Sequence, residues 1–267
     1  MAHKTLVGGT AYEISGGKTL VGGTAYEISG GKTLVGGTGY ELSFSNGNRV
    51  GGLSVGSIVK MNVSSIPTEF IVVHQGKPSN LYDDSCNGTW LLSNLITTTI
   101  AWHSSNSNKY GSSTLHSYLN GTLLNTFDAG IRDLIATVKV PYVNGTGSGG
   151  SVVSGSNGLS TKLFVLSCYE IGWVQSGNTN IYSDGECLSY FQGFANEDSR
   201  RIGYHQNGVA YTWWLRTPVK SGTNYVWTVN NRGGISQSQC VNSNTGLRMA
   251  MILPSNACVD DNFNVIV

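Results

Sequence analysis

The first 45 residues contain three copies of a 14-residue unit. Residues 4–17 read KTLVGGTAYEISGG, residues 18–31 repeat this without change, and the third copy begins KTLVGGTGYELSFS. Within each unit Gly-Gly separates two β-prone runs, and glycine supplies the positive φ angles of a two-residue hairpin turn. Tyr12 and Ile14 alternate with smaller or polar residues, which is the period of a half-buried strand. The repeat therefore predicts a β-structured segment over residues 1–45.

A 14-residue unit with so few apolar side chains cannot bury its own apolar face, so it needs neighbouring units or other chains. We expect a stalk or docking segment that is most stable in a homo-oligomer. A trimer is favoured, because it is the common arrangement in fibrous viral appendages. A flexible, low-complexity leader is the alternative. The repeat is lost in residues 46–267, which are predicted to form the second domain.

Composition excludes several classes of protein. The chain has 267 residues, a net charge of +1 and only 12% charged residues, so no basic excess is available to bind nucleic acid. No apolar run approaches the ~18 residues of a membrane span, and residues 1–4 lack the apolar stretch of a signal peptide. A low-charge chain with 36 Gly, 13 Tyr and 6 Trp is typical of β-rich extracellular or virion-surface proteins.

The residues that could carry chemistry are sparse. Five cysteines without a CxxC pair do not suit a zinc site, and we expect small buried thiols, with one disulfide left open. No GxSxG element or cysteine-nucleophile signature is present. Four pairs of nearby carboxylates lack the spacing of a calcium loop: Asp83-Asp84, Asp184 with Glu186, Glu197-Asp198 and Asp260-Asp261. We therefore expect no metal, no cofactor and no catalytic residue.

Hydrophobic patterning predicts a mixture of short strands and a few helices. Strands are predicted at residues 57–63, 69–74 and 163–167, and an extended segment at 138–142. Helical spacing occurs between residues 90 and 123, first at 90–92 with Leu95 and then at Leu115, Tyr118 and Leu119. A short amphipathic helix is predicted at 129–135, and residues 144–158 form a glycine-rich loop. The predicted fold class is α+β, strand-rich and irregular.

Several runs in the second domain are distinctive together. They are EFIVVHQGKP (69–78), GTWLL (88–92), HSYLN (116–120), LSCYEIG (166–172), WWLRTP (213–218) and GLRMAMILP (246–254). In this order they resemble a domain family of unknown function, DUF6273, over roughly residues 50 to 258. The family is common in gut Firmicutes and their phages, often on tail-fibre or other virion-surface proteins. Its last strand usually reads Gly-Val-Arg-Pro-Ala, whereas this chain has Met249 in place of the proline.

The resemblance extends to the C-type lectin-like fold of the variable proteins of diversity-generating retroelements. It implies a diversified C-terminal surface between residues 204 and 245, built on a fixed scaffold. The scaffold residues are Trp213, Trp214, Arg216, Trp227 and Arg248. The implied ligand-binding residues are His205, Val209, Tyr211, Lys220, Tyr225, Thr228, Asn230, Arg232, Ile235, Gln237, Gln239 and Asn242.

The alternation of side chains along a strand predicts which face each of these residues occupies. Trp227 and Val229 share one face, so Thr228 and Asn230 are expected on the opposite, outward face. Ile235, Gln237 and Gln239 are expected to join them in one binding surface. Of Trp213 and Trp214, one is expected to point inward and the other to line the surface in part. Arg216 is expected to pair with an acid or with carbonyls beneath the sheet.

The expected function is that of a phage tail-fibre, receptor-binding protein or surface adhesin, exposed on the virion. Its partners would be a host cell-surface protein or glycan, bound through the C-terminal surface, and other virion proteins, bound through the repeat. Neither nucleic acid nor membrane insertion is expected. The alternatives are a structural decoration protein and a cell-envelope hydrolase.

Overall fold

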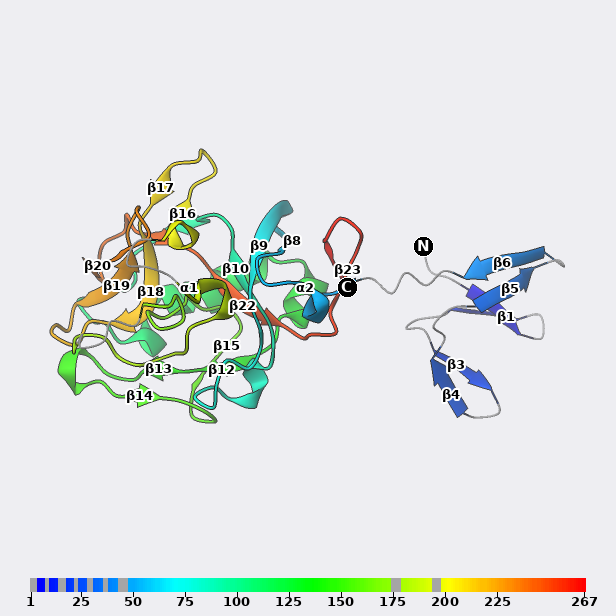
Figure 1. Cartoon of the computed structure of the whole chain (residues 1–267), viewed down its shortest axis with the longest axis horizontal. Coiled ribbons are helices and arrows are strands. Elements are labelled where there is room, and N and C mark those ends of the chain that lie inside the picture. The colour runs from blue at the N-terminus through cyan, green and yellow to red at the C-terminus, as the bar shows by residue number, and fades with distance from the viewer. Residues whose placement is uncertain are drawn as a thin grey trace. The chain divides into compact units, whose positions relative to one another are not determined.

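The computed structural model of the chain describes residues 48–173, 179–193 and 198–267, together with six short strands between residues 4 and 42 (Figure 1). The chain divides into two compact units, Met1–Gly47 and Asn48–Val267. Within the described residues, no helix is both long enough and apolar enough to cross a membrane.

Each copy of the repeat forms one antiparallel hairpin. The pairs are β1 (Lys4–Val7) with β2 (Thr10–Glu13), β3 (Lys18–Val21) with β4 (Thr24–Glu27), and β5 (Gly31–Val35) with β6 (Thr38–Leu42). Val7 pairs with Thr10, so two residues separate the strands, and the predicted hairpins are confirmed. Ile14 lies outside the described residues. The three hairpins are separate two-stranded sheets, and a lone hairpin is marginally stable in water.

The second unit contains a four-stranded antiparallel sheet in the order β22-β10-β9-β8. Its strands are β8 (Ile58–Val63), β9 (Ile66–Gly76), β10 (Gly88–Ser93) and β22 (Ala250–Leu253). The strands predicted at 57–63 and 69–74 are confirmed. The helix predicted at 90–92 is wrong, because β10 is buried along its whole length. A buried strand has a continuous apolar run that periodicity cannot distinguish from a helix.

A five-stranded sheet carries the C-terminal part of the unit, in the order β11-β21-β18-β19-β20. Its strands are β11 (Thr98–Thr99), β18 (Trp213–Pro218), β19 (Tyr225–Val229), β20 (Ile235–Gln239) and β21 (Gly246–Leu247). Neighbours are antiparallel except β18 and β21, which run parallel. Strands β18 and β19 lie inside the sheet, and β20 forms one edge.

The remaining strands form small sheets. They are β7 (Asn48–Arg49) with β23 (Cys258–Val259) and β24 (Val265–Ile266), β12 (Val138–Val140) with β15 (Leu159–Thr161), β13 (Tyr142–Val143) with β14 (Val152–Val153), and β16 (Gly203–Tyr204) with β17 (Ala210–Tyr211). The strand predicted at 163–167 is reduced to one bridge, between Phe164 and Ala250. The glycine-rich segment 144–158 is not all loop, because it includes β14.

Helices are few and short. They are α1 (Thr114–Tyr118), its π-helical continuation η4 (Leu119–Leu123) and α2 (Ala129–Leu134). Single 3-10 turns are η1 (Val50–Gly52), η2 (Asp84–Cys86), η3 (Tyr110–Ser112), η5 (Leu124–Thr126), η6 (Gly147–Gly149), η7 (Ser189–Phe191) and η8 (Ser199–Arg201). The helices predicted at Leu115–Leu119 and at 129–135 are confirmed. The unit is therefore a strand-rich α+β domain.

Strand β18 separates the two apolar clusters of the core. Trp213 and Leu215 belong to the cluster that contains Trp90, whereas Trp214 belongs to the cluster that contains Trp102. Both indoles of the Trp213-Trp214 pair are fully buried and donate to backbone carbonyls of distant segments. The expectation that one of them lines the surface is therefore wrong, because both faces of β18 are covered.

Beneath the five-stranded sheet, Arg216 forms a buried ion pair with Glu170. Both side chains are fully buried, and two guanidinium nitrogens approach the carboxylate oxygens at 2.6 and 2.5 Å. The three remaining N–H groups donate to the carbonyls of Pro141, Val165 and Asp184. All five donors of the guanidinium are thus satisfied. Burial disfavours the charged form of Arg216 and so lowers its pKa. The negative charge of Glu170 and its hydrogen bonds together have the larger effect, and the pKa of Arg216 is raised.

Further polar groups complete this buried network. Tyr82 donates to Glu170 at 2.8 Å, and Thr217 donates to the Asp184 carboxyl group at 2.9 Å. Burial raises the pKa of Asp184 to about 7. The side chain of Arg216 therefore connects three loop segments to the sheet, as the sequence indicated for its pairing with an acid and carbonyls.

Replacing Arg216 with alanine is expected to destabilise the domain by about 3–5 kcal/mol, because Glu170 is then buried without its partner. Urea unfolding, followed by tryptophan fluorescence, measures the change. Arg232→Ala is the matched control, since this arginine is exposed and its loss is expected to cost within about 0.5 kcal/mol. Equal unfolding midpoints for the two variants would contradict a structural role for the ion pair.

Candidate binding surface

The hairpin formed by β16 and β17 extends beyond the neighbouring elements at the top of Figure 1. At its tip the backbone N–H of Gly208 donates to the carbonyl of His205 at 2.9 Å. Gly208 has φ of +77°, a conformation that glycine adopts without strain. The rings of His205 and Tyr211 meet edge to face at 4.5 Å and stiffen the hairpin. Val209 is 53% exposed at the tip.

The base of this hairpin lies on the buried scaffold. A Cβ atom added to Gly203 would lie 2.8 Å from the Trp213 ring, so only glycine fits here. The guanidinium of Arg248 stacks over the same ring, 5.1 Å from its centroid, and donates to the carbonyl of Ser93. The carbonyl of Tyr204 accepts from the N–H of Ile96 at 2.8 Å. Buried side chains of the sheet therefore hold the exposed hairpin in place.

A hollow of about 560 Å³, which we call the β20 hollow, lies beside the hairpin. It brings together five of the predicted ligand-binding residues: Val209, Tyr211, Thr228, Gln237 and Asn242. Its other lining residues were not predicted from the sequence, and they are Ala210, Thr212, Asn231, Ser236, Ser238, Asn244 and Thr245. They are small or polar residues of an Asn/Ser/Thr-rich chain, so composition alone could not single them out. Every residue that lines the hollow is uncharged.

The predicted placement of Thr228 on an exposed face is wrong. Thr228 is fully buried, and its hydroxyl interacts with the hydroxyl of Ser236 at 2.9 Å. Pairing of β19 with β20 sets Trp227 opposite Gln237 and Thr228 opposite Ser236. Paired residues share a face of a sheet, so Gln237 lies on the face of Trp227, opposite to Thr228. Thr228 reaches the hollow as part of its floor, whereas Gln237 lines it from the edge strand β20, although the two side chains leave the sheet on opposite faces.

Other predicted residues lie outside the hollow and have structural contacts. The side-chain oxygen of Asn230 accepts from the N–H groups of Arg232 and Gly234 and thereby closes the β19–β20 turn. Ile235 is half-buried and packs against the core. Lys220 stacks over the Tyr182 ring at 4.6 Å, and Gln239 donates to the Tyr225 hydroxyl at 3.2 Å. The twelve predicted residues therefore do not form one site, because five line the β20 hollow and the others lie elsewhere.

His205 lines a second and larger depression of about 960 Å³, which we call the β9 groove. Three segments form its walls, at residues 63–69, 95–98 and 205–207, with further contributions from α1, η4 and η5. The groove exists because β9 and β10 stop pairing at this end of the sheet. Ser93 still pairs with Phe70, but beyond Asn94 the chain turns away to meet Tyr204 and Leu247. The first residues of β9 are left to line the groove.

The turn at one rim of the β9 groove is strained. Ser64 and Ser65 connect β8 to β9, and both have positive φ, at 53° and 61°. Two such residues in a two-residue hairpin make a type I′ turn, which strongly prefers Asn-Gly. Serine has no such preference, and each residue in this region costs on the order of 1 kcal/mol or more. Strain of this kind concentrates at functional sites.

Replacing the pair with the preferred residues, in the double variant Ser64→Asn, Ser65→Gly, is expected to stabilise the domain by about 1–2 kcal/mol. Calorimetric melting measures the gain. The matched control is Ser104→Asn, Ser105→Gly, in an exposed serine pair where φ is not positive, and no gain is expected there. A melting temperature that is unchanged or lowered by the first double variant would refute strain in this turn.

A serine–histidine pair lies outside the hollow and the groove. The Nδ1 atom of His74 accepts from the hydroxyl of Ser189 at 2.8 Å and from its N–H at 3.3 Å. Burial lowers the pKa of His74, which favours the neutral ring that these bonds require. This serine–histidine pair was not predicted from the sequence, because 115 residues separate its members. The two hydrogen bonds to the imidazole connect turn η7 to β9.

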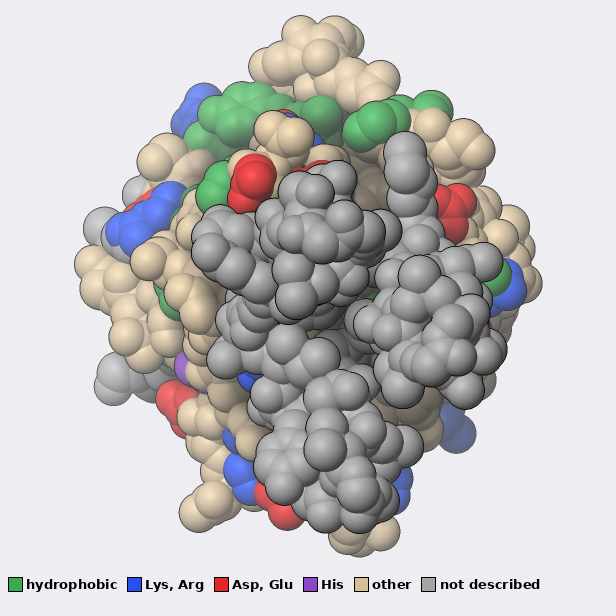
Figure 2. Space-filling view, turned by 90° about the vertical axis from the view of Figure 1, so that its right-hand side faces the viewer, with side chains coloured by type: hydrophobic (Ala, Val, Ile, Leu, Met, Phe, Trp, Pro, Cys, Tyr) green, Lys and Arg blue, Asp and Glu red, His purple; other side chains and the backbone are tan. Residues whose placement is uncertain are grey.

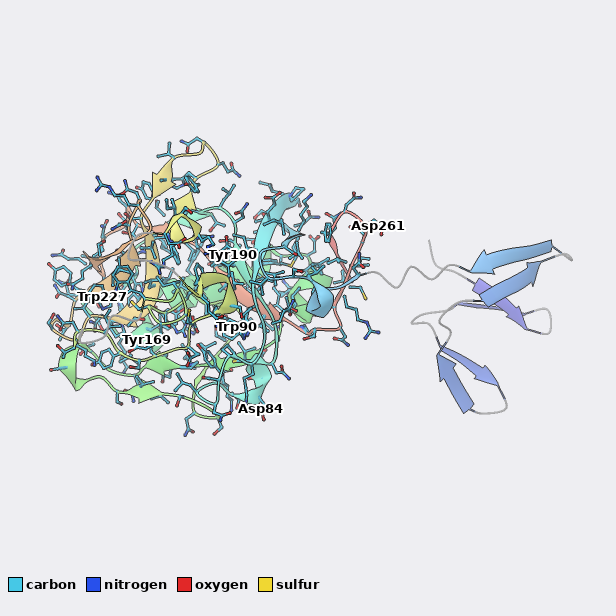
Figure 3. The ribbon with its side chains drawn as sticks, viewed as in Figure 1. Asp84, Trp90, Tyr169, Tyr190, Trp227 and Asp261 are labelled. Atoms are coloured by element: carbon cyan, nitrogen blue, oxygen red, sulfur yellow. The ribbon has the colours of Figure 1, made fainter. Side chains whose placement is uncertain are left out.

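The described members of the carboxylate pairs do not converge, and Glu197 lies outside the described residues. Asp84 binds Lys77, Asp198 accepts from the N–H of Arg200, and Asp260 accepts from Asn264. Asp84 and Asp261 lie at separate edges of the domain (Figure 3). Over the described residues, no group of three or more His, Cys, Asp or Glu side chains is placed to hold a metal ion. All five cysteines are free. Charged side chains of both signs are dispersed among polar ones on the face drawn in Figure 2.

Fold and surface together define a strand-rich α+β domain with an exposed hairpin and an uncharged hollow beside it. The family model described as Domain of unknown function (DUF6273) matches residues 87–255, and the chain belongs to this family. No curated protein matches the chain, and no solved structure does.

Proposed function

We propose that the domain is a binding module, displayed on a virion or cell surface, that attaches to a host cell-surface protein or glycan through the β20 hollow and the adjoining hairpin. The observation that carries the proposal is the convergence of five predicted ligand-binding residues, from three separate stretches of chain, in one uncharged hollow.

The chemistry of the hollow suits recognition. Amide and hydroxyl side chains surround Tyr211 and the exposed Val209, and such mixtures of aromatic anchors with adaptable polar groups characterise binding surfaces. Exposed apolar side chains gather nearby, since Tyr204 and Val241 are also exposed. Strands β18 and β19 form a rigid base beneath them. Binding energy is therefore not lost in ordering the base of the site.

The same arrangement supports a C-type lectin-like fold whose C-terminal surface is diversified by a retroelement. In such a protein the varied residues must be dispensable for folding. Val209, Gln237 and Asn242 are exposed, whereas Trp213, Trp214, Arg216, Trp227 and Arg248 are buried. Exposed positions thus alternate with a buried scaffold along the segment in question.

The repeat supports display on a larger assembly. Its three hairpins are separate sheets, and each needs apolar surface from elsewhere to become stable. We propose that residues 4–45 assemble the chain into a homo-oligomer, with a trimer favoured, and dock it onto other virion proteins at the tail fibre. The same hairpins favour a second candidate function, that of a structural decoration protein. A cell-envelope hydrolase is less favoured, because Ser189 and His74 already have structural roles.

The triple variant Val209→Ser, Gln237→Ala, Asn242→Ala is expected to abolish adhesion to the natural host cell. It should leave melting nearly unchanged, since each exposed substitution costs within about 0.5 kcal/mol. The matched control changes the same residue types elsewhere on the surface, as Val55→Ser, Asn80→Ala, Gln192→Ala. A folded triple variant that still adheres would move the site elsewhere, first of all to the glycine-rich segment 144–158.

Removal of the repeat is expected to dissociate the assembly. Sedimentation of the full chain should give an oligomer, whereas a truncated chain that begins at Asn46 should give a monomer, because the hairpins supply the contact between chains. If both sediment as monomers, the stalk proposal is wrong. If both sediment as the same oligomer, the contact lies in the second unit.

A further inference from the structure

The β9 groove presents threonine oxygens that can act only as hydrogen-bond acceptors, beside the side chains of Ser64, Tyr118, His205, Gln206 and Asn207, which can also donate. Four threonines line it, at positions 68, 97, 98 and 126. Each hydroxyl donates its single hydrogen to a backbone carbonyl of the protein, namely that of Ile66, Leu247, Thr99 and Leu123 respectively. The lone pairs that remain on these oxygens can only accept. A ligand that satisfies them must therefore bring donors.

The charges at the β9 groove restrict the class of ligand that it can bind. Glu69 is exposed at the groove, where its Oε2 atom accepts from the side-chain amide of Asn94 at 3.0 Å. No Lys or Arg occurs among the described residues that line the groove. Phosphate, sulfate and carboxylate ligands are recognised chiefly through such cations, so an anionic ligand does not match this site. A neutral ligand, or a ligand with an amino group, matches this site.

The backbone of β9 argues against a peptide that adds a strand to the sheet. The carbonyl of Glu69 faces the groove side, where it accepts from the N–H of Asn94 at 2.9 Å. Residues two apart in a strand direct their backbone groups to the same side, so Pro67 also faces this side. Proline has no N–H, and at an edge it prevents strand pairing.

Apolar surface accompanies these acceptors. Ile66 is 57% exposed at the rim, and Leu95 and Tyr118 also line the groove. A sugar ring has the matching properties, because it combines several hydroxyl donors with apolar C–H faces. We infer that the β9 groove is a second binding site and that it takes a carbohydrate without acidic groups. The inference concerns a site separate from the β20 hollow and stands whether or not that hollow binds a receptor.

The test uses the full chain on a printed array of neutral, amine-bearing, sialylated and sulfated oligosaccharides. Neutral or amine-bearing glycans should be retained, and the acidic ones should not. With the strongest-binding oligosaccharide, calorimetric titration should show an affinity at least about tenfold lower for Glu69→Ala and about threefold lower for Thr68→Val, because each removes an acceptor. Glu186→Ala and Thr223→Val, at exposed positions outside the groove, are the matched controls.

The triple variant in the β20 hollow separates the two sites. It should bind the same oligosaccharide with unchanged affinity, even where it no longer adheres to host cells. Three results would each overturn the inference: no retention of any glycan, preferential retention of acidic glycans, or binding that survives both Glu69→Ala and Thr68→Val in folded protein. Loss of oligosaccharide binding in the triple variant would place the sugar in the β20 hollow instead.

Discussion

The buried ion pair between Arg216 and Glu170 is the interaction on which the rest of the domain depends. The domain has short strands and long connections, so backbone pairing alone leaves many segments without a fixed position. One guanidinium, held on a central strand, fixes the carbonyls of Pro141, Val165 and Asp184 as well as the carboxylate. In a medium of low polarity each of these groups would be costly without its partner. The loops are therefore positioned by a polar centre, with the two apolar clusters packed around it.

This construction separates the residues that determine stability from those that face solvent. Strands β18 and β19 have buried side chains on both faces, so their sequence is constrained by packing at nearly every position. The hairpin tip and the edge strand β20 have exposed positions that contribute little to the core. A surface of this kind can change its chemistry without loss of the fold, which is what the proposed binding function would require.

Local signals in the sequence predicted much of the fold. Gly-Gly between β-prone runs gave the three hairpins, and apolar spacing gave α1, α2, β8 and β9. The failures involve long-range pairing. Trp90 in β10 was misassigned because a strand buried on both faces lacks alternation. Thr228 was placed on the wrong face relative to Gln237, because the register of β19 with β20 is absent from either strand alone. The β9 groove joins segments about 140 residues apart, so no local pattern could have revealed it.

The thiols of the domain have a consequence for the kind of contact that stabilises it. Cys86, Cys168 and Cys240 are buried, and burial raises the pKa of Cys86 and of Cys240 to about 12. A thiol with so high a pKa is almost entirely protonated at neutral pH and reacts slowly with oxidants. With all five cysteines free, no disulfide contributes to the stability of the fold. The fold therefore depends on non-covalent contacts alone, chiefly the two apolar clusters and the buried ion pair between them.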